Sequence, residues 1–127
     1  MDRTALSTED RIINAARETF LKYGYHGTKL QQVAESAKVN KSVIHYYFRT
    51  KEKLYKTILR EIILLIESTD WTDARTRDVN SNVNWFLFTE MYNNKNLFEN
   101  TIKELYPNDW RKKQHQIVVL FEIEKIF

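Results

Sequence analysis

The sequence predicts an all-α protein, and three observations support that fold class. The 127 residues include only 2 Gly and 1 Pro, too few for the tight turns that most β folds need. Apolar residues recur at helical spacing in several segments. A hydrophobic content of 43% with 13% aromatic residues suits a packed core rather than disorder. We expect a three-helix helix-turn-helix domain, joined by a long connecting helix to a small helical C-terminal region.

The first predicted helix begins at Ser7 or Thr8 and runs to about Tyr23. Gly24 follows its last apolar residue, the usual position for a glycine that ends a helix. Gly27 then allows a second sharp turn. One face of this helix is apolar and supports the shorter helices that follow. Its residues are Ile12, Ile13, Ala16, Phe20 and Tyr23.

Two shorter helices joined by a turn are predicted between residues 28 and 48. Thr28 occupies the expected N-cap position, and Gln31 three residues later completes a capping box. After a turn at 37–40, Asn40 caps the second helix. The first helix buries Leu30, Val33, Ala34 and Ala37, and the second buries Ile44 and Phe48.

The opposite side of the second short helix carries polar and aromatic side chains. Ser42, Val43, His45 and Tyr46 occupy that side, with Lys41 and Tyr47 on its flanks. A helix with a small buried face and an exposed face of hydroxyl, imidazole and phenol groups suits a DNA major groove. Packing is the alternative role for Tyr46 and Tyr47.

A longer helix is expected from Lys51 to about Ser68, with an apolar surface over nearly half its circumference. So broad a stripe implies more than one packing partner. The next segment, 68–78, is polar and lacks periodicity, which predicts a loop. The stripe consists of Leu54, Tyr55, Ile58, Leu59, Ile62, Leu65 and Ile66.

Three more helices are predicted after this loop, at 79–94, at 97–106 before Pro107, and from Trp110 onward. The last is apolar almost all round from Ile117 to Phe127, so we expect another element to cover it. Either the chain is a piece of a longer protein, or a second copy covers this surface. An aromatic group either lines a ligand cavity or, as we favour, forms plain core. It consists of Trp85, Phe86, Phe88, Met91 and Tyr92.

Positive charge is concentrated in one segment. Residues 25–60 contain eight Lys or Arg against two acidic residues, a net charge of +6, whereas the rest of the chain sums to −3. Such a cluster is expected of a phosphate-binding surface. A solvated charged face is the alternative explanation for charge alone. Its coincidence with a helix-turn-helix pattern favours nucleic acid.

Several other classes of protein are disfavoured. There is no cysteine, and the three histidines, His26, His45 and His115, lack the spacing of metal ligands. No paired carboxylates, Ser-His-Asp set or glycine-rich phosphate loop stands out, so we predict no enzyme, cofactor or metal. The apolar runs at 62–66 and 117–121 are too short to cross a bilayer, and the charged and polar N-terminal residues lead us to expect no secretory signal. The expected location is the cytoplasm.

Five ordered pieces between Arg11 and Leu59 together resemble a known family. They are FLKYGY (20–25), TKLQQVAESA (28–37), VNK (39–41), HYYF (45–48) and KEKL (51–54). In this order and spacing they resemble the TetR family of bacterial transcriptional regulators. The resemblance covers about 50 of the 127 residues.

The resemblance implies a repressor that binds a palindromic double-stranded DNA operator as a homodimer and is released by a small apolar or amphipathic effector. It implies a helix-turn-helix DNA-binding domain at 1–50. Residues 51–127 would hold the connecting helix and part of an effector-binding and dimerisation domain. Implied phosphate contacts are Thr28, Tyr47 and Lys51. The implied base-facing set is Gln31, Lys41, Ser42, Val43 and His45, with Tyr46 at its boundary and Lys29 also in the DNA-binding set.

The chemistry of these residues agrees with their implied roles. Lys41 can donate to guanine, Gln31 can bridge adenine, and Val43 can touch a thymine methyl group. Three departures from the family stand out. Lys38 occupies a turn position where glycine is usual, at a strain of about 1 kcal/mol if the backbone there is left-handed. His45 replaces a common tyrosine, and family members usually extend well past this length. A shortened helical interaction protein that acts through a partner subunit, without binding DNA alone, is therefore the alternative function.

Overall fold

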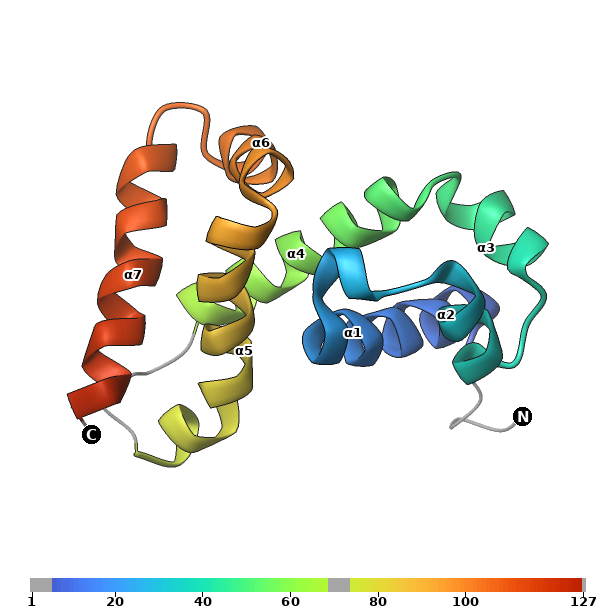
Figure 1. Ribbon diagram of the computed structural model, residues 1–127, viewed down its shortest axis with the longest axis horizontal. Helices are drawn as coiled ribbons and strands as arrows, with labels where there is room; N and C mark the ends of the chain where they lie inside the picture. The colour runs from blue at the N-terminus through green and yellow to red at the C-terminus, as the bar shows by residue number, and fades with distance from the viewer. Residues whose placement is uncertain (1–5, 69–73, 127) are drawn as a thin grey trace. The chain divides into compact units, whose positions relative to one another are not determined.

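The computed structural model describes residues 6–68 and 74–126, and every regular element in those ranges is an α-helix (Figure 1). This confirms the predicted fold class. The chain divides into two compact units, Met1–Ile58 and Leu59–Phe127. The functional assignment of 1–50 and 51–127 stays a prediction. The helices are α1 (Thr8–Gly27), α2 (Leu30–Ala37), α3 (Lys41–Phe48), α4 (Lys51–Glu67), α5 (Ala74–Asn93), α6 (Lys95–Leu105) and α7 (Trp110–Ile126).

The first helix begins where the sequence predicts. Ser7 is its N-cap, and its hydroxyl accepts a hydrogen bond from the Asp10 amide at 3.1 Å. Gly24, at φ 72° and ψ 179°, breaks the regular helix, although helical hydrogen bonding resumes as far as Gly27. Tyr23 was predicted to be part of the apolar stripe, but it is 47% exposed. Ala15 is buried in α1 instead.

The predicted cap of α2 is wrong by one residue. The N-cap is Lys29, and the side-chain oxygen of Gln32, not Gln31, accepts a hydrogen bond from the Lys29 amide at 2.8 Å. Thr28 is drawn inward because its hydroxyl lies 2.8 Å from the Gly24 carbonyl oxygen and 3.3 Å from that of Thr19. A hydroxyl bonded in this way is not available to cap the next helix.

Residues from four helices form the core of the N-terminal unit. An aromatic group ties the start of α4 to α1, since the ring of Tyr55 lies 5.3 Å from that of Phe20 and 4.8 Å from that of Tyr25. Ile44 and Phe48 are buried on α3, as predicted, at 1% and 8% exposure. The other core side chains include Ile12, Ala16, Val33, Ala34, Ala37, Leu54 and Ile58.

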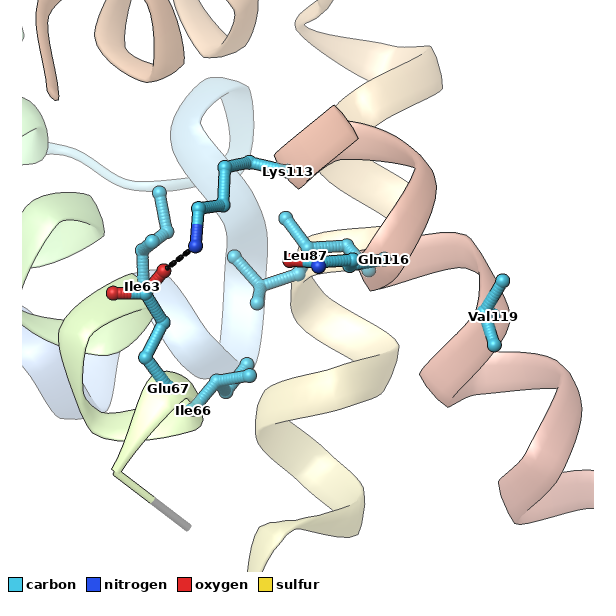
Figure 2. A pocket seen from close by; sticks show the side chains of 8 residues that line it. Ile63, Ile66, Glu67, Leu87, Lys113, Gln116 and Val119 are labelled. Atoms are coloured by element: carbon cyan, nitrogen blue, oxygen red, sulfur yellow. Dashed lines mark hydrogen bonds and ion pairs between the residues drawn. The ribbon is translucent and has the colours of Figure 1, made fainter. Parts of the chain in front are cut away.

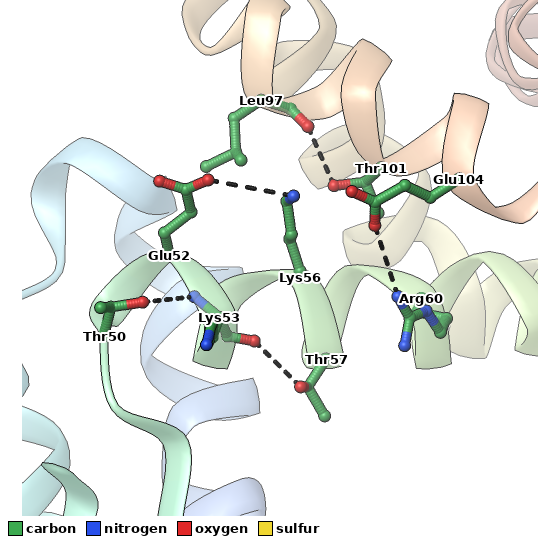
Figure 3. Close-up of polar contacts among 9 residues, drawn as sticks. All are labelled: Thr50, Glu52, Lys53, Lys56, Thr57, Arg60, Leu97, Thr101 and Glu104. Atoms are coloured by element: carbon green, nitrogen blue, oxygen red, sulfur yellow. Dashed lines mark hydrogen bonds and ion pairs between the residues drawn. The ribbon is translucent and has the colours of Figure 1, made fainter.

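Two residues with positive φ, Lys38 and Arg49, flank α3. Lys38 ends α2 in the left-handed conformation, at φ 59° and ψ 47°. Arg49 follows α3 at φ 70° and ψ −55°. The Thr50 amide donates to the Phe48 carbonyl at 2.8 Å, which closes a γ-turn around Arg49. Thr50 in turn accepts a hydrogen bond from the Lys53 amide at 3.0 Å and caps α4 (Figure 3).

The C-terminal unit contains the second half of α4 together with α5, α6 and α7. α5 packs against both α6 and α7, and Arg60 of α4 pairs with Glu104 of α6 at 3.6 Å (Figure 3). The predicted loop at 68–78 is too long, because α5 already begins at Ala74. Within α4, Leu65 is 48% exposed and Ile63, at 3%, is buried in its stead. The predicted all-round apolar surface of the last helix lies largely outside the residues whose side chains are described.

The left-handed turn at Lys38 generates a stability prediction. Lys38→Gly should raise the free energy of unfolding by about 0.5–1 kcal/mol, because glycine adopts positive φ without steric strain. Chemical denaturation monitored by circular dichroism measures this change. Lys38→Ala is the matched control, since it removes the same charge and keeps a Cβ. Equal stabilisation by both variants would contradict a backbone origin.

Candidate nucleic-acid interface

The outer face of α3 is the candidate interface. Lys41, Ser42 and His45 are exposed, and Val43 is half-buried. Tyr46 and Tyr47 are 70% and 42% exposed, and their rings meet edge to face at 5.1 Å. Each predicted contact residue of this helix is therefore open to solvent at least in part, while Ile44 and Phe48 face the core.

The other predicted contact residues are arranged less uniformly. Lys29 and Gln31 are exposed at the start of α2, where the Gln31 amide donates to Glu35 at 3.2 Å. Thr28 is only 1% exposed, so its side chain is not on the surface where a phosphate contact was expected. Lys51 is half-buried, and its ammonium lies 4.3 Å from the centre of the Tyr25 ring. Most of the predicted contact residues are thus exposed on α2 and α3, whereas Thr28 is buried and Lys51 is half-buried.

A shallow hollow of about 770 Å³ adjoins the outer face of α3. Its lining includes Ser42, Val43, Tyr46 and Tyr47 of α3 and Thr8 and Arg11 of α1. Arg11 also donates to the carbonyl oxygen of Lys38 at 3.4 Å, so it supports the left-handed turn that joins α2 to α3. The hydroxyl, ammonium and guanidinium groups at this surface are hydrogen-bond donors of the kind that phosphates and base edges accept.

Sequence reasoning gave no site role to two cationic residues, Arg11 and Arg49. Arg11 was assigned to the supporting helix, and only its contact with the turn reveals its position. Arg49 is exposed in the γ-turn between α3 and α4. The conformation of Arg49 could have been anticipated from the short connection between two helices, since only two residues separate the end of α3 from the start of α4. So short a connection favours an unusual backbone conformation.

The C-terminal unit contains a separate cavity of about 470 Å³ (Figure 2). Its walls are mostly apolar, and an ion pair between Lys113 of α7 and Glu67 of α4 lies at one side. Partial burial acts to raise the pKa of Glu67, but the hydrogen bond from Lys113 holds it below the ordinary value of 4.5. The lining residues are Ile63, Ile66, Glu67, Leu87, Lys113, Gln116, Ile117 and Val119.

The aromatic group predicted on α5 is not part of this cavity. Phe86 and Met91 are buried in the core, at 2% and 8% exposure. Trp85 and Tyr92 lie on the surface, at 59% and 70% exposure, and Phe88 is half-buried. Two of the five residues, Phe86 and Met91, are therefore core residues. The α5 residue that lines the cavity is Leu87.

Residues 6–68 and 74–126 hold no group of three or more His, Asp or Glu side chains placed to bind a metal ion. None of the helices described there is long and apolar enough to span a membrane.

Residues 12–58 match the profile of a family described as bacterial regulatory proteins, tetR family. The matched segment, a little over a third of the chain, is therefore similar to the N-terminal domain of the TetR family. The HTH-type transcriptional regulator RutR of Escherichia coli is 44% identical over 61 residues, which cover 48% of this chain and 29% of RutR. The HTH-type transcriptional repressor NicS of Pseudomonas putida is 42% identical over 55 residues, covering 43% of this chain and 26% of NicS. The matched region thus spans less than a third of either relative.

Similarity of structure extends over more of the chain. The crystal structure of HlyIIR, a hemolysin II transcriptional regulator, aligns with a TM-score of 0.62 at 23% identity. The alignment covers 94% of this chain and 75% of HlyIIR. At this level of identity the comparison establishes the fold. The C-terminal helices of this chain therefore resemble a solved arrangement.

Tyr106, beside the ion pair of the cavity, generates a pH prediction. Burial raises its pKa from 10.0 to about 12, and the Glu67 carboxylate adds to the rise. A raised pKa stabilises the folded state below pH 10, and this contribution is lost as the pH rises from 10 towards 12. Tyr106→Phe should flatten the loss of stability in this window, as measured by urea denaturation at several pH values.

The wild type shares part of this alkaline dependence with Tyr25, whose pKa is also raised, by burial and then by the charge of Glu52. The difference in tyrosinate absorbance between wild type and Tyr106→Phe isolates the titration of Tyr106. If this difference titrates at the ordinary value of 10.0, the assignment is wrong.

Proposed function

We propose that this chain is a sequence-specific DNA-binding transcriptional regulator that acts as a repressor in the cytoplasm. The observation that carries the proposal is the orientation of α3. With Ile44 and Phe48 buried, the exposed residues Lys41, Ser42 and His45 face outward together. An eight-residue helix presented in this way fits the width of a major groove.

Charge and similarity both support this proposal. The net charge of +6 over residues 25–60 favours association with phosphates, whatever the base sequence. Base selection would come from Lys41, Gln31 and Val43, with Tyr47 and Lys29 at the backbone. The names of RutR and NicS describe a transcriptional regulator and a repressor, respectively, both of helix-turn-helix type.

The repressor would bind a palindromic operator as a homodimer. One α3 helix covers only a few base pairs, and two copies would read half-sites roughly 34–36 Å apart or a multiple of it. Two symmetry-related domains therefore account for both affinity and a two-fold symmetric operator.

The cavity in the C-terminal unit would receive the effector. Its volume of about 470 Å³ falls in the range of small-molecule sites. Apolar walls with an ion pair at one side suit an apolar or amphipathic molecule with a polar group near Glu67 or Lys113. Binding there would release the repressor from its operator.

A random duplex library tests DNA recognition. Selection should enrich a two-fold symmetric sequence, and binding to it should weaken steeply with salt. Lys41→Ala or His45→Ala should reduce the preference for one base position in each half-site by about 1–3 kcal/mol. Lys112→Ala is the matched control, because it removes an exposed cation from α7. Equal effects of all three variants on every duplex, or no enrichment at all, would reject the proposal.

The cavity is tested with an amphipathic fluorescent probe, anilinonaphthalene sulfonate. Val119→Trp should lower its affinity by about tenfold, because the larger side chain occupies the space that the probe enters. Leu64→Trp is the control, at an exposed α4 position that does not line the cavity. Fluorescence titration measures both. Unchanged affinity in Val119→Trp would place the probe elsewhere.

A further inference from the structure

We infer that Arg11 and Lys38 together bind a backbone phosphate of duplex DNA at the hollow beside α3. Neither residue belongs to the DNA-binding set that the sequence predicts. The inference rests on the proposed function, because it assumes that α3 enters a major groove. It adds a phosphate contact from α1 and from the turn between α2 and α3, which would fix the position of the domain on the duplex whatever the base sequence.

The hollow brings these two cations next to the exposed face of α3. Arg11 and Lys38 line it together with Ser42 and Tyr47, and all four side chains are exposed. The major groove is only about 12 Å wide, so a helix that occupies it has a phosphate strand on either side. Cations that share a hollow with the outer face of α3 are therefore placed to reach one of these strands.

The Arg11 guanidinium has donors that the fold does not use. It carries five N–H donors, and one of them reaches the Lys38 carbonyl oxygen at 3.4 Å, which is a long hydrogen bond. Within residues 6–68 and 74–126, Arg11 forms no ion pair with a carboxylate. A planar guanidinium can therefore hold the turn through one edge and bind a phosphate through another.

Lys38 is held in an uncommon backbone conformation at the same place. Its φ of 59° lies in the left-handed region, which favours glycine over any residue with a Cβ. Strained residues of this kind are concentrated at functional sites, where the surrounding structure maintains the strain. An exposed lysine in this turn adds a positive charge near Arg11, whereas a glycine would add none.

Negative charge at the hollow is limited. Among the described residues that line it, Glu35 is the one acid, and its carboxylate accepts a hydrogen bond from the Gln31 side-chain amide at 3.2 Å. The two cations outnumber this carboxylate, so the hollow is positive overall. Duplex DNA presents closely spaced negative phosphates, which a positive hollow of this kind attracts.

The salt dependence of binding to the selected duplex tests this contact. Arg11→Met keeps an alkyl stem but removes the charge, so the slope of log affinity against log salt should become shallower by about 0.9 for each copy bound. Affinity for random duplexes should fall by the same factor, because a phosphate carries no sequence information. Lys22→Ala is the matched control and should keep the wild-type slope, since it removes an exposed α1 cation that does not line the hollow.

Lys38→Gly separates DNA binding from folding. Because it relaxes the turn, it should leave the chain at least as stable as the wild type, yet it should weaken binding to every duplex and make the salt slope shallower. Arg11→Lys, which keeps a cation at the hollow, should retain more of the slope than Arg11→Met. A wild-type slope in either Arg11→Met or Lys38→Gly would overturn the joint contact.

Duplexes with a single neutral methylphosphonate test the contact from the DNA side. One such replacement in each half-site should weaken binding of the wild type and have no further effect on Arg11→Met, because the two changes remove the same interaction. Lys22→Ala should stay as sensitive to this replacement as the wild type. If Arg11→Met keeps the wild-type sensitivity at every phosphate, the inference is wrong.

The same measurements separate this inference from the proposed function. Enrichment of a two-fold symmetric duplex whose salt slope is unaffected by Arg11→Met supports the regulator and rejects the contact. Salt-dependent binding without enrichment of any sequence, with a shallower slope in Arg11→Met, supports the contact and rejects the sequence-specific regulator. A chain that binds no duplex rejects both.

Discussion

The burial of two side chains on α3 is the constraint on which the candidate interface depends. Ile44 and Phe48 are one helical turn apart, and both lie in the core of the N-terminal unit. An eight-residue helix has little stability in isolation, so its rotation about its own axis is set by this contact. Because the two anchors occupy one face, Lys41, Ser42, His45 and Tyr46 must occupy the remainder. The surface chemistry of this domain thus follows from its packing.

Periodicity in the sequence was sufficient to predict most of the N-terminal unit. Both faces of α3 were predicted correctly, since the two buried positions are one turn apart and the rest are polar or aromatic. The position of Thr28 was not predictable in this way. A hydroxyl side chain before a helix can either cap that helix or donate a hydrogen bond into the core. Only the tertiary position of the Gly24 and Thr19 carbonyl oxygens, to which Thr28 donates, decides between the two. The contact roles of the exposed residues stay predictions.

The C-terminal unit shows where local patterns fail. Ile63 and Leu65 are equally apolar neighbours on α4, and the position of the other helices determines that Ile63 is buried. The first turn of α5 contains few apolar residues, so its sequence resembles a loop. The cavity was not predictable because α4, α5 and α7 each contribute part of its wall. The aromatic residues of α5 lie partly in the core, as Phe86 does, and partly on the surface, as Trp85 and Tyr92 do.

The γ-turn at Arg49 has a consequence for motion. The Arg49 amide donates to the His45 carbonyl oxygen at 2.9 Å. The Thr50 amide donates to the Phe48 carbonyl oxygen, and the Thr50 hydroxyl accepts from the Lys53 amide, so both residues of the connection are fixed by hydrogen bonds. α3 cannot rotate or fray at its C-terminal end without disturbing the first turn of α4. The hydrogen bonds of this two-residue connection therefore join the last turn of α3 directly to the first turn of α4.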